Sequence, residues 1–102
     1  MAFTVEFLPS AVPQIESLPR GAGRQVVDAV AALADDPRPP GSRRLVGIPE
    51  GVSRLRVGDY RVTYQVKDER LLVLVVRVAD RREAYAQRAL ERLRMHLRRE
   101  GE

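Results

Sequence analysis

Residues 52–66 have the sequence VSRLRVGDYRVTYQV, in which two alternating segments flank Gly58-Asp59. Apolar and polar residues alternate through Val52–Val57 and again through Tyr60–Val66, a pattern typical of strands with one more polar face. Gly58-Asp59 fits a two-residue hairpin turn with glycine in the first position. These residues therefore predict an antiparallel β-hairpin.

The remaining sequence predicts two helices before the hairpin, and a further strand and helix after it. Segments with strand-like patterns are Ala2–Leu8, Arg43–Val46, Val52–Val57, Tyr60–Val66 and the nearly all-apolar Leu71–Val78. A short helix is predicted from Pro9 to Leu18, and a longer one through the apolar stripe from Val26 to Ala34. Helical spacing returns at about residues 81–99. The order β-α-α-β-β-β-β-α indicates an α+β fold, with two N-terminal helices packed on a mostly antiparallel sheet.

The composition excludes several classes of protein. At 102 residues the chain has room for one domain, here residues 1–102. It contains no cysteine and a single histidine, His96, which excludes disulfide scaffolds, thiolate chemistry and multi-histidine metal sites. No apolar run is long enough to span a membrane, and no signal peptide is evident, so we expect a cytoplasmic protein.

The basic residues are almost all arginine. The net charge is +4, and Lys67 is the single lysine. This bias fits a GC-rich genome, and it also fits phosphate binding, because a guanidinium group can bind two phosphate oxygens at once. Composition does not separate these interpretations, whereas position does.

The hairpin gathers three arginines on one face. The two-residue turn places Arg56 opposite Arg61, and Arg54 shares their face by the period of two. The three guanidinium groups then lie within about 10 Å of one another. Facing like charges destabilise a sheet, so the cluster indicates an anion from outside. The alternative is that these arginines pair with acids placed elsewhere or point into water.

A second basic group, Arg81-Arg82, follows the apolar strand, and Tyr85 comes one helical turn later. Tyr85 can stack on a base or donate its hydroxyl, or it can be an ordinary core residue. Arginine stabilises the charge of a phosphodiester transition state but does not act as a general base. If RNA is cleaved, the 2′-hydroxyl is the expected nucleophile and neither a metal nor another cofactor is required.

Three motifs together resemble the RelE family of bacterial toxins from type II toxin–antitoxin modules. These motifs are Arg43-Arg44-Leu45, the LRVGDYRVTY stretch of residues 55–64, and VRVADRREAY at residues 76–85. The resemblance implies a RelE-like fold related to small microbial ribonucleases. It also implies an mRNA interferase, an endoribonuclease that cuts messenger RNA in the ribosomal A site and so inhibits translation.

The resemblance also implies roles for particular residues. Arg61 and Arg81 match arginines that hold the scissile phosphate, and Tyr85 matches a tyrosine that stacks on the nucleotide. Arg54 stands where relatives carry a lysine thought to help in proton transfer or charge balance. The residues implied in RNA binding are Arg43, Arg44, Arg56 and Arg82.

The chain departs from the family pattern at positions that bear on catalysis. Arg54 is a far weaker base than lysine, and Val52 stands where a second family lysine is found. Asp80 replaces a histidine of many relatives, and it acts either as an alternative base or as the N-cap of the last helix, with the cap favoured. Both a weak, ribosome-assisted ribonuclease and a degenerate toxin fit these departures.

Partners and alternatives follow from the same resemblance. A cognate RelB-like antitoxin is expected to cover the basic face, and operator DNA is expected to be bound only through the antitoxin complex. The last helix, with Leu90, Leu93 and Leu97, either packs on the sheet or is gripped by the antitoxin. The alternatives to a nuclease that acts on ribosomes and mRNA are a ParE-type inhibitor of DNA gyrase and a bare nucleic-acid-binding module.

Overall fold

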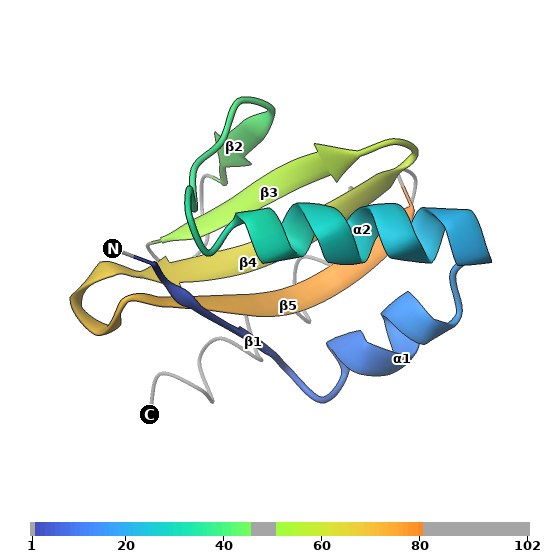
Figure 1. Ribbon diagram of the computed structural model, residues 1–102, viewed down its shortest axis with the longest axis horizontal. Helices are drawn as coiled ribbons and strands as arrows, with labels where there is room; N and C mark the ends of the chain where they lie inside the picture. Colours follow the sequence, from blue (N-terminus) through green and yellow to red (C-terminus); the bar gives the residue numbers. More distant parts are fainter. Residues whose placement is uncertain (1, 46–50, 81–102) are drawn as a thin grey trace.

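In the computed structural model, residues 2–45 and 51–80 are described, and they form a five-stranded sheet with two helices on one of its faces (Figure 1). The strand order is β1-β5-β4-β3-β2, with β1 parallel to β5 and the other three pairings antiparallel. The strands are β1 (Thr4–Phe7), β2 (Ser42–Arg44), β3 (Val52–Val57), β4 (Tyr60–Lys67) and β5 (Leu72–Asp80). The helices are α1 (Ala11–Glu16) and α2 (Arg20–Ala32). The predicted α+β class is confirmed, while the predicted last helix lies outside the described residues.

The central hairpin, β3–β4, has the predicted register. Val57 lies opposite Tyr60, and Arg56 lies opposite Arg61. Gly58 has a φ of 59°, and Asp59 is not among the non-glycine residues with positive φ. This combination matches a type II′ turn, whose twist suits the two flanking strands.

The main core lies between the helices and the sheet. Val26, Val30 and Leu33 on the helical side pack into one cluster with Val62 and Val75 of the central strands. Burying each such side chain contributes about 1.5–3 kcal/mol. A second apolar cluster, formed by Leu8, Val52, Leu74 and Val76, lies apart from the first. β5 is therefore buried on both faces from Val73 to Val76, as its apolar sequence predicts.

A β-bulge interrupts the pairing of β4 with β5. The register shifts between Thr63 and Tyr64, which makes Val76 the extra residue of β5. Beyond the shift, Arg77 lies opposite Thr63 on the face that points away from the helices. The backbone N–H of Val78, just after the bulge, donates a hydrogen bond of 2.8 Å to Gln14 Oε1 of α1.

Several boundaries differ from the sequence prediction. The first helix ends at Glu16 instead of Leu18. The second begins at Arg20, before the predicted stripe, so it includes Gly21 and Gly23. Burial of the apolar stripe outweighs a glycine cost of about 1 kcal/mol per position. Leu71 has a left-handed φ of 49°, so β5 starts one residue later than predicted. None of the helices described in these ranges has the length and apolar character needed to cross a membrane.

Candidate functional site

Five arginines lie on the sheet face that points away from the helices, and we call them the arginine face. One row crosses four strands: Arg43 lies opposite Arg54, Arg54 opposite Thr63, and Thr63 opposite Arg77. The next row, two residues further along the strands, contains Arg56 and Arg61 as direct partners. The members of the arginine face are Arg43, Arg54, Arg56, Arg61 and Arg77.

These arginines differ in exposure and in contacts. Arg61 is only 7% exposed, and its NH1 donates a hydrogen bond of 3.1 Å to the carbonyl oxygen of Tyr60. Arg54 and Arg77 are half-buried, while Arg43 and Arg56 are exposed. Within residues 2–45 and 51–80, no carboxylate forms an ion pair with Arg43, Arg56 or Arg61. An anchored guanidinium thus lies beside others that reach solvent.

The structure brings most of the predicted hairpin residues together. Arg54, Arg56 and Arg61 share one face, as the turn predicted, and Arg43 joins them from β2. Arg44 does not belong to the arginine face. Its partner across the strands is Ser53, and the alternation along β2 directs it to the opposite face of the sheet from Arg43. The sequence-predicted Arg81, Arg82 and Tyr85 lie outside the described residues. Asp80 ends β5 opposite Tyr60, and its two interpretations stay open.

Sequence reasoning missed Arg77. Regular alternation along β5 places it with the core, and only the bulge turns it to the arginine face. A signal was nevertheless present, because Arg77 is the one charged residue in the apolar run from Leu71 to Ala79. A charge in a strand that is otherwise apolar indicates either a bulge or a functional role.

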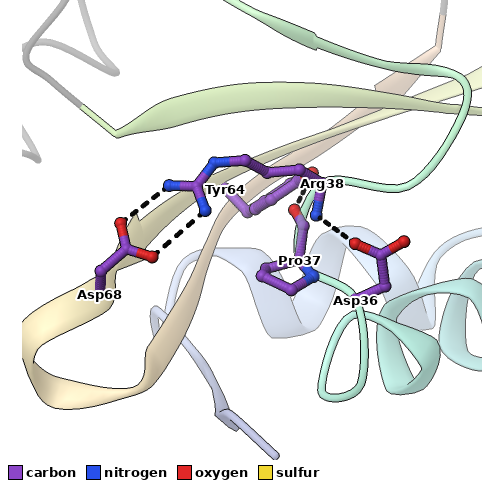
Figure 2. A network of polar contacts seen from close by, with 5 residues as sticks. All are labelled: Asp36, Pro37, Arg38, Tyr64 and Asp68. Atoms are coloured by element: carbon purple, nitrogen blue, oxygen red, sulfur yellow. Dashed lines mark hydrogen bonds and ion pairs between the residues drawn. The ribbon is translucent and has the colours of Figure 1, made fainter.

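A separate polar network joins the loop after α2 to the turn between β4 and β5 (Figure 2). Arg38 donates two hydrogen bonds to Asp68, of 2.9 and 3.2 Å, and the Tyr64 hydroxyl donates one of 2.7 Å to the Pro37 carbonyl. The hydrogen bonds from Arg38 hold the pKa of Asp68 below its usual value. Burial raises the pKa of Tyr64.

A polar hollow of about 810 Å³ adjoins this network. Arg38, Arg44, Lys67 and Arg70 line it together with two carboxylates, Asp68 and Glu69. Its charge is mixed, and Arg38 is already paired with Asp68. On the arginine face, by contrast, Arg43, Arg56 and Arg61 have no ion pair with a carboxylate of the described residues.

The arginine face can bind phosphate oxygens and stabilise charge that develops on them. A guanidinium keeps its proton in a protein, so none of the five arginines can act as a base. In the part of the chain that the structure describes, no three His, Cys, Asp or Glu side chains gather to hold a metal ion. The chemistry that these five side chains can offer is thus the binding of anions and not proton transfer.

Comparison with known proteins agrees with this geometry. The family model for the ParE toxin of the type II toxin–antitoxin system parDE matches residues 5–85. This chain is a member of the RelE/ParE toxin family. A RelE-like toxin protein of Escherichia coli is 32% identical to this toxin over 82 residues, which cover 79% of the chain and 85% of the relative. The family resemblance inferred from the three motifs is confirmed.

Solved RelE structures share the fold of this toxin. An arginine-to-alanine double mutant of Escherichia coli RelE in the free state is 27% identical, with a TM-score of 0.71, covering 89% of this chain and 93% of that one. RelE from the archaeal RelE–RelB complex of Pyrococcus horikoshii OT3 is 25% identical, with a TM-score of 0.71 and coverage of 79% and 97%. The predicted RelE-like architecture is therefore confirmed.

Proposed function

We propose that this toxin is a ribosome-dependent endoribonuclease that cleaves messenger RNA and thereby inhibits translation. The observation that carries the proposal is the direct pairing of Arg56 with Arg61 on a rigid sheet face, beside Arg54. Such facing cations destabilise a sheet unless an anion binds them. A polyanion with closely spaced phosphates is the partner that best fits this arrangement.

In the proposed reaction, the 2′-hydroxyl oxygen of one nucleotide attacks the adjacent phosphorus atom. The bond from phosphorus to the 5′-oxygen of the next nucleotide breaks, leaving a 2′,3′-cyclic phosphate and a 5′-hydroxyl. The proton of the 2′-hydroxyl passes to a base, and the leaving 5′-oxygen takes up a proton. No metal takes part in this scheme.

The arginines stabilise the negative charge that builds up on the phosphate oxygens. Arg61 and Arg81 are the proposed phosphate ligands, Arg54 balances charge, and Tyr85 stacks on the nucleotide. Because Arg61 is buried and held by the Tyr60 carbonyl, it needs little rearrangement when the charge develops. Losing one such donor typically lowers the rate constant by about 10²–10³.

Mapping of transcript ends in a purified translation system tests this function. We expect wild-type toxin to produce cleaved transcripts with 5′-hydroxyl ends and to stop translation. Arg61→Gln should lower cleavage by about 10²-fold or more. Arg24→Gln, at an exposed site on α2, removes the same charge and should cleave like wild type. Inhibition of translation with every transcript intact would contradict the proposal.

A second candidate function is inhibition of DNA gyrase without RNA cleavage. The matching family model, which carries the name ParE, favours it. Arg54 also favours it, because a guanidinium is a poorer proton carrier than the expected lysine. In a supercoiling assay this candidate predicts inhibition of gyrase at toxin concentrations that leave messenger RNA intact. The ribonuclease proposal predicts cleavage of messenger RNA at toxin concentrations that leave gyrase active.

We further propose that a RelB-like antitoxin, encoded next to this toxin, binds it and covers the arginine face. The structural similarity to RelE in the Pyrococcus horikoshii RelE–RelB complex supports this proposal. An acidic segment on the antitoxin would neutralise Arg43 and Arg56, which are exposed. Co-expression of the neighbouring reading frame should relieve growth arrest and co-purify with the toxin.

A further inference from the structure

The polar hollow is a second place where cations gather, and none of the five residues of the arginine face lines it. Arg44 lines it from β2, where the strand alternation directs its side chain to the opposite sheet face from Arg43. Lys67 and Arg70 line it from the end of β4 and from the turn that follows. Within residues 2–45 and 51–80, the side chains of Arg44, Lys67 and Arg70 have no ion pair and no hydrogen bond.

The two carboxylates of the polar hollow do not cancel these charges. Arg38 already donates hydrogen bonds of 2.9 and 3.2 Å to Asp68, as Figure 2 shows. The other carboxylate, Glu69, is exposed. Because the ion pair neutralises Arg38 and Asp68, three cations are left with one carboxylate, and the polar hollow carries a net positive charge.

Ser53 gives an independent indication of a ligand. Its side chain lines the polar hollow, yet the residue is only 6% exposed. Its neighbour across the strands, Tyr64, donates its hydroxyl to the Pro37 carbonyl, whereas the Ser53 hydroxyl has no hydrogen-bond partner among the described residues. An unpaired buried hydroxyl costs free energy, which a ligand that accepts its hydrogen bond would recover. Arg44 lies directly opposite Ser53, at a Cβ separation of about 4.5–5.5 Å, so both can reach one ligand.

The walls of the polar hollow are held in place without a ligand. The pair of Arg38 and Asp68 joins the loop after α2 to the turn after β4. Gly51 accepts a hydrogen bond of 2.7 Å from the Val66 N–H, and a Cβ atom on Gly51 would lie 2.6 Å from the Val66 carbonyl oxygen. A preformed site loses less conformational entropy when it binds, so these contacts favour affinity.

We propose that the polar hollow binds a phosphate group, at a site separate from the arginine face and independent of RNA cleavage. Its volume of about 810 Å³ is that of a small-molecule site. A single guanidinium suffices for the Asp68 carboxylate, whereas the polar hollow offers donors from three strands and a turn to one ligand. These donors suit the several oxygens of a phosphate better than the two of a carboxylate. They are Arg44, Ser53, Lys67 and Arg70.

NMR titrations of the full-length toxin test the site, because they report binding at each backbone N–H. Pyrophosphate is the probe for a free phosphate compound, and a short 2′-O-methyl RNA without terminal phosphates is the probe for an RNA backbone. We expect saturable shifts at Ser53, Val66 and Lys67. A response to pyrophosphate assigns a free phosphate compound, and a response to the RNA alone assigns a phosphodiester. If both probes shift only Arg56 and Arg61, the site is overturned.

Variants separate ligand binding from folding. Ser53→Ala and Arg44→Gln should each weaken the affinity read at Val66 by about tenfold. Ser53→Ala removes an unpaired hydroxyl, so without ligand it should be at least as stable as wild type in thermal unfolding. Arg43→Gln, on the opposite sheet face, and Arg24→Gln, on α2, remove the same charge as Arg44→Gln and should leave this affinity unchanged.

Other results would contradict the site or its ligand. Unchanged affinity in both Ser53→Ala and Arg44→Gln overturns the site, and a less stable Ser53→Ala with normal affinity assigns Ser53 to the fold. An equal response to a glutamate-rich peptide of the same charge overturns the choice of phosphate. Because none of these measurements involves cleavage, the phosphate site and the ribonuclease function stand or fall separately.

Discussion

At the scale of single residues, the ion pair between Arg38 and Asp68 links two loops that are distant in the sequence. Both side chains are exposed, so the pair contributes modestly to stability and is weakened by salt. Its effect on the pKa of Asp68 nevertheless gives the pair a distinct pH signature, which can be measured separately from the rest of the molecule.

Because Arg38 donates hydrogen bonds to Asp68, the pKa of Asp68 is lower in the folded chain than in the unfolded chain. A lowered carboxyl pKa stabilises the fold above the unfolded pKa, and that stability is lost as the pH falls through the folded pKa. We expect Asp68→Asn to remove this part of the acid dependence of the free energy of unfolding. Urea titrations at several acidic pH values measure it, and Asp28→Asn on α2 is the control. Parallel curves for wild type and Asp68→Asn would contradict the expectation.

Tyr64 makes a second residue-scale prediction, because it is fully buried and donates its hydroxyl to the Pro37 carbonyl. Tyr64→Phe should lower the free energy of unfolding by about 0.5–1.5 kcal/mol at neutral pH. Burial raises the pKa of Tyr64, so stability should fall as the pH rises above the usual tyrosine value of about 10. Tyr64→Phe should lose this alkaline dependence. A retained dependence in the variant would show that another group causes it.

At the scale of secondary-structure elements, local sequence signals predicted the central hairpin correctly. Features that depend on contacts between distant segments were not predicted. A two-residue turn fixes the register, so the pairing of Arg56 with Arg61 follows from Gly58-Asp59 alone. The bulge in β5 does not follow from the local sequence, because one extra residue turns Arg77 to the other face without changing the apolar pattern. The parallel pairing of β1 with β5 and the contact of Arg38 with Asp68 join distant segments, which periodicity does not register.

The bulge in β5 leads to a prediction about the stability of the whole strand. Gln14→Leu removes the acceptor of the Val78 N–H and leaves a part-buried donor without its partner. We expect a loss of about 1–3 kcal/mol in the free energy of unfolding. If the bulge relaxes, Arg77 turns from the arginine face, and cleavage should fall along with stability. Glu16→Gln, at an exposed position of the same helix, serves as the control for both measurements.

At the scale of the whole molecule, the charges of the arginine face should lower the stability of the fold while favouring the proposed binding of an anion. The chain carries a net charge of +4, and one face of its sheet carries five arginines. Self-repulsion of this kind destabilises a compact state, whereas an anion that binds only the folded form stabilises it. The free toxin is therefore expected to be less stable than its fold alone allows.

Arg56→Thr tests this opposition. Removing the charge opposite Arg61 should raise the free energy of unfolding by about 0.2–1 kcal/mol at low salt, because like charges no longer face each other. Cleavage should fall in the same variant. Added sulfate should stabilise wild type more than Arg56→Thr, since it binds between the paired guanidinium groups, and chloride at equal ionic strength should not distinguish them. If Arg56→Thr is less stable than wild type in every salt, Arg56 serves the fold, and the facing arginines no longer argue for a phosphate ligand.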